Sequence, residues 1–188
     1  MKLVVGLGNP GRQYAATRHN VGFWWIDRLC ALDRVALRME ARFHGEIGRL
    51  ARGGRECWLL KPATYMNASG RAVQALAHFY KFAPEDVLVV HDELDLPPGA
   101  AKLKKGGGVA GHNGLKDIAA VLGQDFWRLR IGIGHPGDRA LVTGYVLAPP
   151  RKEEAEQIEA AIARSLEVWP LLLEGHTERA MHRLHTKV

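Results

Sequence analysis

The sequence lacks any apolar run long enough to cross a membrane. Its longest apolar stretches, such as Val168 to Leu173, fall far short of the roughly 20 residues that a transmembrane helix needs. The chain also opens without the basic and apolar segments of a secretory signal, and without an Arg- and Ser-rich transit segment. We therefore expect the protein to act in the cytoplasm, where it is made.

Cysteine is scarce as well. The two cysteines, Cys30 and Cys57, lie far apart in the sequence among apolar neighbours and form no C-x-x-C pair. Buried free thiols fit this placement better than a disulfide does, and they agree with a reducing cytoplasm.

Several catalytic motifs are absent. The sequence contains no G-x-x-x-x-G-K-[ST], no H-E-x-x-H and no G-x-S-x-G, so P-loop, zinc-protease and serine-elbow chemistry have no support. Gly6 to Gly11 does match the dinucleotide motif G-x-G-x-x-G. In that motif a helix begins within the glycines, so that its N-terminus faces the pyrophosphate of the dinucleotide. Here Pro10 and the polar stretch to Asn20 separate the glycines from the predicted helix. We interpret the segment as a loop that projects side chains from the end of a strand.

The composition is that of one basic globular domain. The 188 residues carry 26 Lys and Arg against 20 Asp and Glu, giving a net charge of +6 and a pI near 9.5. This balance favours a polyanionic partner. A hydrophobic content of 47%, without internal repeats or a linker, fits a single domain over residues 1–188 with one sizeable core.

Hydrophobic periodicity alternates between strands and helices along the chain. The pattern predicts strands at 2–7, 47–50, 57–60, 87–90, 101–104 and 129–133, and helices at 21–37, 69–80, 115–122 and 151–173, with a shorter helix after Gly175. This alternation predicts the α/β class, with a twisted mixed, largely parallel sheet flanked by helices.

His19 and Asp92 are the strongest candidates for a catalytic pair. His19 precedes the first helix and Asp92 follows the strand 87–90, so both should lie at the carboxyl edge of the sheet, where ligands bind. A carboxylate that accepts one imidazole N–H leaves the other nitrogen free to take a proton from water. The alternative is a helix cap or surface histidine beside a solvated acidic turn, Asp92 to Asp95.

Three asparagines, Asn9, Asn67 and Asn113, are predicted at the same edge. Each one alone is typical of a turn residue or a helix N-cap. Together they indicate a site for an acyl substrate, because neutral amides can hold a peptide group and stabilise an oxyanion without titrating.

Basic residues surround a glycine run. Lys102 to Gly108, with Arg128 and Arg130 further on, places cations beside flexible backbone amides, for which phosphate is the natural ligand. A solvated strand edge is the alternative. His182 and His185 share a helix face, but no third metal ligand is placed near them, so we expect surface histidines.

Five linked segments resemble bacterial peptidyl-tRNA hydrolases, in the family's order and across nearly the whole chain. They are Gly6 to Gly11 with Tyr14 and Thr17 to Gly22, then Lys61 to Asn67, His91 to Pro97, Gly111 to Lys116, and Arg128 to Pro136. The resemblance implies a monomeric α/β globule that hydrolyses the ester between a peptide and the terminal ribose of tRNA. It implies binding of the acceptor stem and CCA end, without a metal, an organic cofactor or an obligate protein partner.

By motif position, His19 resembles the family's general base, Asp92 the carboxylate that supports it, and Asn9 the residue that distinguishes N-blocked from free aminoacyl groups. The residues that resemble the family's contacts to the tRNA end or the substrate are Tyr14, Tyr65, Asn67 and Asn113, and Met66 resembles the apolar wall of the site. Lys104 and Arg130 resemble the cations that hold the tRNA 5′ phosphate.

Two departures from the family's pattern are Tyr65, at a position that is often Phe, and the additional cation Lys105. The resemblance implies a lid and tRNA-binding surface within residues 137–150 and the C-terminal helix. A non-catalytic RNA-binding relative is the alternative, because chloroplast splicing factors resemble this family and can keep its catalytic residues. A nucleotide-binding oxidoreductase is a further, weaker alternative.

Overall fold

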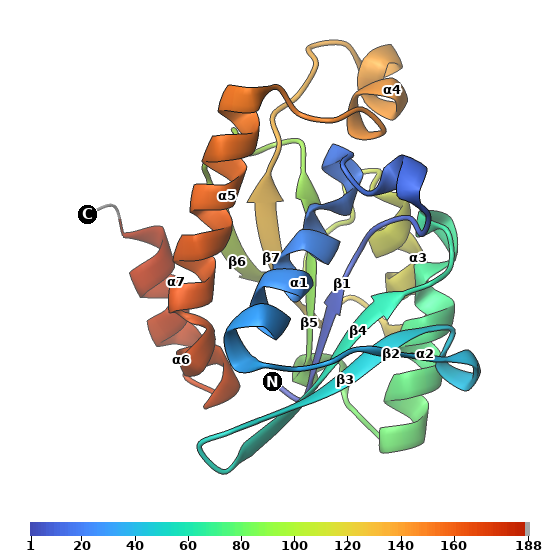
Figure 1. Cartoon of the computed structure of the whole chain (residues 1–188), viewed down its shortest axis with the longest axis vertical. Helices are drawn as coiled ribbons and strands as arrows, with labels where there is room; N and C mark the ends of the chain where they lie inside the picture. Colours follow the sequence, from blue (N-terminus) through green and yellow to red (C-terminus); the bar gives the residue numbers. More distant parts are fainter. Residues whose placement is uncertain (187–188) are drawn as a thin grey trace.

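A computed structural model describes residues 1–186 and contains one seven-stranded mixed sheet, in the order β2-β3-β4-β1-β5-β7-β6 (Figure 1). The strands are β1 (Leu3–Gly6), β2 (Arg38–Glu40), β3 (Gly45–Arg52), β4 (Arg55–Pro62), β5 (Val87–Glu93), β6 (Ala101–Lys105) and β7 (Trp127–Gly132). The four central strands run parallel, whereas β2, β3 and β6 pair antiparallel with their neighbours. The predicted mixed α/β fold is confirmed, with parallel pairing confined to the centre of the sheet.

Helices cover both faces of the sheet. They are α1 (Val21–Asp33), α2 (Ser69–Tyr80), α3 (Asn113–Leu122), α4 (Val142–Val146), α5 (Lys152–Glu167), α6 (Trp169–Leu173) and α7 (Thr177–His185). One apolar cluster joins one face of the sheet to α1, α5, α6 and α7, and a second cluster joins the other face to α2 and α3. Figure 1 shows α4 beyond the sheet, above the ends of β5 and β7.

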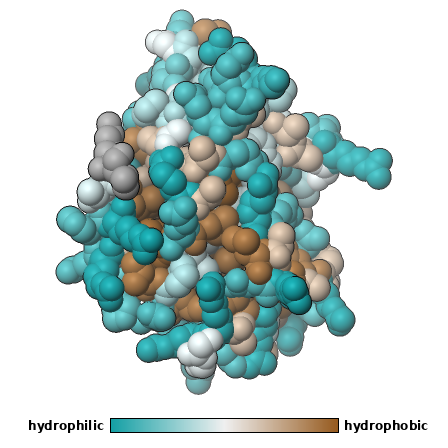
Figure 2. All heavy atoms as spheres, turned by 60° about the vertical axis from the view of Figure 1, so that its left-hand side comes forward, coloured by the Kyte–Doolittle hydropathy of each residue, from teal (hydrophilic) through white to brown (hydrophobic). Residues whose placement is uncertain are grey.

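Hydrophilic residues make up much of the face that carries α5, α6 and α7. They surround an area of hydrophobic residues at the centre of this view (Figure 2). No helix within residues 1–186 is both long enough and apolar enough to cross a membrane. Both cysteines are free, as predicted, and burial raises the pKa of Cys57 to about 12 and that of Cys30 to about 11.

Element boundaries differ from the prediction in strands and in helices: β3 and β4 each extend two residues further at both ends, and β5 extends three residues further, to Glu93. The first helix stops at Asp33 rather than residue 37, because Arg34 takes a left-handed conformation with φ 54° and caps the helix. The predicted helix 151–173 is divided into α5 and α6, since Pro170 lacks an N–H and cannot continue the first helix. The short elements β2 and α4 were not predicted.

Two glycines allow α1 to lie directly against the sheet. A Cβ atom on Gly6 would lie 2.3 Å from the carbonyl oxygen of Gly22, and one on Gly22 would lie 2.4 Å from the carbonyl oxygen of Val90. The motif glycine Gly6 therefore serves helix–strand packing, and α1 begins only at Val21, too late to present its N-terminus to a phosphate at the glycines. This packing places the loop that carries His19 beside the end of β5.

Candidate active site

A cavity of about 990 Å³ opens at the carboxyl edge of the parallel strands. Nine of the ten predicted site residues line it: Asn9, His19, Tyr65, Met66, Asn67, Asp92, Lys104, Asn113 and Arg130. The tenth, Tyr14, lies outside the lining and contacts Tyr65 edge to face, with ring centroids 6.3 Å apart. The fold therefore gathers residues from six separate segments at one cavity.

His19 and Asp92 form the predicted pair. His19 lies in the 3-10 turn η2 (Arg18–Asn20), and its Nδ1 is 2.8 Å from Oδ2 of Asp92, the sixth residue of β5. The side chains are 11% and 2% exposed, so the solvated acidic turn considered for Asp92 is wrong. Because a carboxylate only accepts, Nδ1 of His19 carries a proton, and in the neutral imidazole Nε2 therefore keeps its lone pair.

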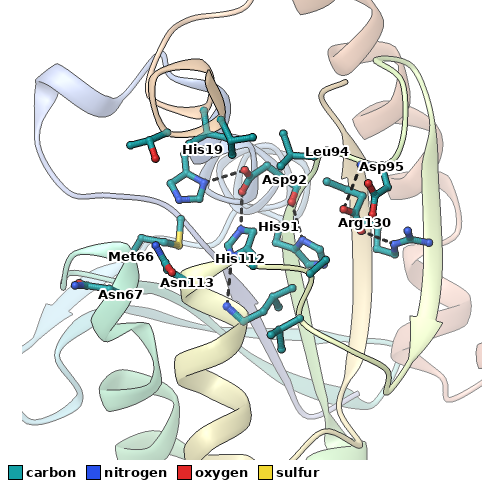
Figure 3. A pocket seen from close by; sticks show the side chains of 18 of the residues that line it. His19, Met66, Asn67, His91, Asp92, Leu94, Asp95, His112, Asn113 and Arg130 are labelled. Carbon is teal, nitrogen blue, oxygen red and sulfur yellow. Dashed lines mark hydrogen bonds and ion pairs between the residues drawn. The ribbon is translucent and has the colours of Figure 1, made fainter. Parts of the chain in front are cut away.

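A second histidine binds the same carboxylate. Nε2 of His112 lies 2.8 Å from Oδ1 of Asp92, while Nδ1 of His112 accepts the backbone N–H of Leu115 at 3.3 Å and caps α3. This capping bond fixes the tautomer of His112, with the proton on Nε2 directed at Asp92. Figure 3 shows Asp92 between the rings of His19 and His112.

The third neighbour is His91, which is fully buried beneath the pair. Its Nδ1–H donates to the backbone carbonyl of Asp92 at 2.9 Å, and its ring lies edge-on to His112. Burial, together with the positive groups near it, lowers the pKa of His91 to about 3. His91 is therefore a neutral ring near neutral pH, packed against His112.

Charge and burial compete at the pair itself. Burial opposes the charged form of Asp92, but the imidazoles of His19 and His112 outweigh it and hold the pKa of this carboxyl far below its usual range. Burial alone would lower the pKa of His19, yet the Asp92 carboxylate and the hydrogen bond to it leave that pKa raised above its usual value. The carboxylate thus makes His19 a stronger base.

His19, Asp92 and His112 are also the group of side chains within residues 1–186 that could meet around a metal ion, with ligand atoms within 4.8 Å of one another. Nδ1 of His19 and Nε2 of His112 each lie 2.8 Å from an oxygen of Asp92. At this distance each nitrogen donates a proton in a hydrogen bond to the carboxylate. Metal binding would need those protons to leave. The arrangement described is a hydrogen-bonded one.

Asn9 is buried beside His19 and is held from two sides. Its Oδ1 accepts the backbone N–H of Met66 at 2.7 Å, and its own backbone is bonded to the side chain of Asn20. Asn67 and Asn113 are exposed at the rim of the cavity, and neither is a helix N-cap, because Ala68 and His112 occupy those positions. The cap interpretation of these two asparagines is therefore wrong.

The predicted phosphate cations differ in availability. Lys104 is exposed and makes no ion pair within residues 1–186, whereas Nε of Arg130 donates to Glu93 at 2.8 Å. Arg128 is 2% exposed and its guanidinium donates to the carbonyls of Gly107 and Gly108. Arg128 therefore holds the glycine run in place, and its inclusion among cations free to bind phosphate is wrong.

The C-terminal helix contacts the basic strand. Nε2 of His185 accepts the backbone N–H of Leu103 on β6 at 3.0 Å, and burial with nearby Lys102 and Arg130 lowers the pKa of His185. Both His182 and His185 are exposed, as predicted, and His185 in addition joins α7 to the edge strand β6.

Arg18 joins the turn that carries His19 to the segment 142–148, part of which lines the cavity. Its Nη1 donates to the carbonyls of Tyr145 at 2.9 Å and Ala148 at 3.3 Å, and its Nη2 pairs with Glu154 at 3.2 Å. The guanidinium also lies 3.8 Å from the centroid of the Tyr145 ring. Since Val142 and Val146 of the same segment line the cavity, this contact fixes one wall of the site.

We expect Arg18→Ala to lower the free energy of unfolding by about 2 to 3 kcal/mol, because carbonyls and a carboxylate lose a charged donor that is only 8% exposed. Urea unfolding measures this. The matched control is Arg28→Ala, which removes an exposed pair with Glu159 between α1 and α5 and should cost less than about 1 kcal/mol. Equal losses in the two variants would show that the buried contacts of Arg18 contribute no more than a surface ion pair.

A buried histidine–carboxylate pair at the edge of a mixed sheet, in a cavity with a basic rim, is an arrangement typical of α/β hydrolytic enzymes. The family described as peptidyl-tRNA hydrolase matches residues 3–188, and the chain belongs to that family. This confirms the predicted family, and with it the prediction of a peptidyl-tRNA hydrolase.

Similar proteins agree along their whole length. The chain is 63% identical to a peptidyl-tRNA hydrolase of Nitrosospira multiformis over 188 residues, covering 100% of this chain and 98% of that protein. It is 64% identical to one of Methylobacillus flagellatus, again over 100% of this chain and 97% of the relative. The crystal structure of peptidyl-tRNA hydrolase from Acinetobacter baumannii superposes with a TM-score of 0.97 at 46% identity, covering 99% of this chain and 95% of that one.

Sequence reasoning missed four residues that build the site: Arg18, Asn20, His91 and His112. Each stands beside a residue that was predicted, inside a segment already singled out. Only the place of His112, directly before a helix, gave a local signal for its capping role.

Proposed function

We propose that the protein cleaves the ester between a peptide and the terminal ribose of tRNA, with water activated by His19 as general base. The observation that carries this is the bond from Nδ1–H of His19 to Asp92, which leaves Nε2 without a hydrogen-bond partner in residues 1–186. Figure 3 shows that nitrogen turned away from Asp92. A base so held needs no covalent nucleophile.

In the proposed reaction, Nε2 of His19 takes a proton from water as the oxygen attacks the ester carbonyl carbon. The charge moves to the carbonyl oxygen, where side-chain amides such as that of Asn113 stabilise it. The intermediate collapses with cleavage of the bond to the ribose oxygen, and the proton on His19 passes to that oxygen. The products are the free peptide acid and tRNA with its ribose hydroxyl restored.

Discrimination follows from the orientation of Asn9. Because its Oδ1 accepts from Met66, the amide NH2 group is the end left to meet the substrate, where it can donate to the carbonyl of the first peptide linkage. A free aminoacyl group offers an ammonium there, which cannot accept a hydrogen bond. An active site that is built to form a hydrogen bond to its substrate has a much lower kcat/KM for a substrate that lacks the partner group.

The remaining contacts serve tRNA. Lys104 and Arg130 would bind the 5′ phosphate, Arg130 through the part of its guanidinium not used by Glu93. Tyr14, Tyr65 and Asn67 would contact the CCA end, with Met66 as an apolar wall. We extend the proposal to a monomer that acts in the cytoplasm.

Lys104→Ala and Arg130→Ala should each raise KM with little change in kcat, because the phosphate lies away from the reacting ester. Each lost phosphate contact should also reduce the slope of log(kcat/KM) against log[salt] by about 0.7 to 0.9. Steady-state kinetics over a range of salt concentrations measures both. Arg55→Ala, at the opposite end of β4 from the cavity, is the control. Salt slopes equal to that of the control would remove both residues from the phosphate site.

The proposal as a whole is tested by single-turnover cleavage of an N-acetylated aminoacyl-tRNA. Release of the blocked amino acid is expected. Tight tRNA binding without release would favour the non-catalytic RNA-binding relative.

A further inference from the structure

We propose that Asn20 is a positioning residue that holds Asn9 in the orientation that separates N-blocked from free aminoacyl groups. The inference rests on the proposed function of Asn9 and extends it to a residue that does not itself touch the substrate. Asn20 follows the base His19 directly in the turn η2.

The side chain of Asn20 is bonded entirely to Asn9. Its Oδ1 accepts the backbone N–H of Asn9 at 2.8 Å, and its Nδ2 donates to the backbone carbonyl of Asn9 at 2.9 Å. Asn20 is 1% exposed, so water does not compete for these bonds. The amide thus clamps both polar groups of one peptide backbone, as a neighbouring strand would.

Asn20 supplies the hydrogen bonds that the backbone of Asn9 makes. Within residues 1–186 its N–H and carbonyl have no hydrogen-bond partner except Asn20. The loop around it contains Gly8 and Gly11, the latter with φ 106°, and Pro10 has no N–H to contribute. Without Asn20 this loop would lose its anchor, and two buried backbone groups would lose their partners.

The side chain of Asn9 is fixed only at its far end, where Oδ1 accepts from Met66 at 2.7 Å. Backbone and side-chain bonds together set the direction of its NH2 group into the cavity that Asn9 lines. Because Asn20 and His19 share one turn, the clamp also fixes the distance between the discriminating amide and the base. Selectivity therefore depends on Asn20, whereas the basicity of His19 depends on Asp92.

The test compares single-turnover rates on N-acetylaminoacyl-tRNA and on the unblocked aminoacyl-tRNA. In Asn20→Ala the ratio of the two rates should fall by about tenfold or more, the loss expected when one hydrogen bond is no longer aligned. The pH at the midpoint of the acid limb should not change, because the pair of His19 and Asp92 is untouched. A merely structural role would lower both rates alike.

Two further comparisons sharpen the result. In the Asn9→Ala background, Asn20→Ala should not change the ratio further, since the residue that it positions is gone. The control Ser165→Ala removes one buried hydrogen bond between α1 and α5 and one within α5, away from the cavity, and should leave the ratio at the wild-type value.

If Asn20→Ala does not fold, Asn20→Asp supplies the test. It keeps the acceptor for the Asn9 N–H and loses the donor to the Asn9 carbonyl, so an intermediate ratio is expected. A wild-type ratio in a folded Asn20 variant, or independent effects of the two asparagines, would overturn the inference alone. A wild-type enzyme that does not favour the blocked ester would overturn the role of Asn9 as well.

Discussion

His19→Ala should reduce the hydrolysis of a blocked aminoacyl-tRNA by about 10²- to 10⁴-fold, the usual cost of removing an acid–base group. The fold should survive, because within residues 1–186 the side chain of His19 makes one hydrogen bond, to Asp92, and lies in a cavity wall. Asp92 would keep its second partner, His112. The loss should therefore appear in kcat and not in tRNA binding.

The measurement is kcat beside thermal unfolding and tRNA affinity for the same preparation. His78→Ala, an exposed histidine on α2, serves as control and should retain full activity. A His19→Ala protein that is folded and nearly as active as wild type would remove His19 as the base. A variant that unfolds would assign it a structural role instead.

Asp92→Asn should cost a similar factor, about 10²- to 10⁴-fold, for a different reason. An asparagine can present its NH2 group to Nδ1 of His19, which would then have to accept. The proton of the neutral imidazole would move to Nε2, the nitrogen that must take a proton from water. The base would be present in the wrong tautomer.

The pH profile separates this effect from simple misfolding. In the wild type the pKa of His19 is raised by Asp92, and His19 must be neutral to act, so kcat/KM should fall as pH drops through a midpoint above the usual 6.5. Without the carboxylate, burial dominates and lowers that pKa. The residual activity of Asp92→Asn should thus show an acid limb displaced to lower pH, and an unchanged midpoint would exclude Asp92 as the group that tunes His19.

The proximity of His19 and Asp92 could be predicted from the sequence because the argument needed only topology. His19 before a helix and Asp92 after a buried strand must both lie at the carboxyl edge if the strands are parallel, and β1 and β5 are. The helix at 69–80 was predicted to the residue, since its apolar face repeats at helical spacing. These features are encoded locally.

The supporting residues could not be predicted in the same way. Asn20 acts on Asn9 across 11 residues of irregular loop, and Arg18 on Tyr145 across 127 residues. Arg128 alternates with apolar residues on β7 just as Arg130 does, and only the fold shows that Arg128 is buried and bonded to the glycine run while Arg130 pairs with Glu93. Such contacts depend on tertiary packing, which the hydrophobic periodicity of the sequence does not reveal.

The most direct test of the account is single-turnover release of an N-acetylated amino acid from its tRNA by the wild-type protein, with the unblocked aminoacyl-tRNA beside it. We predict rapid cleavage of the blocked ester and slow or undetectable cleavage of the free one. Tight binding of both tRNAs without cleavage of either would contradict the central claim that this site is a hydrolytic one.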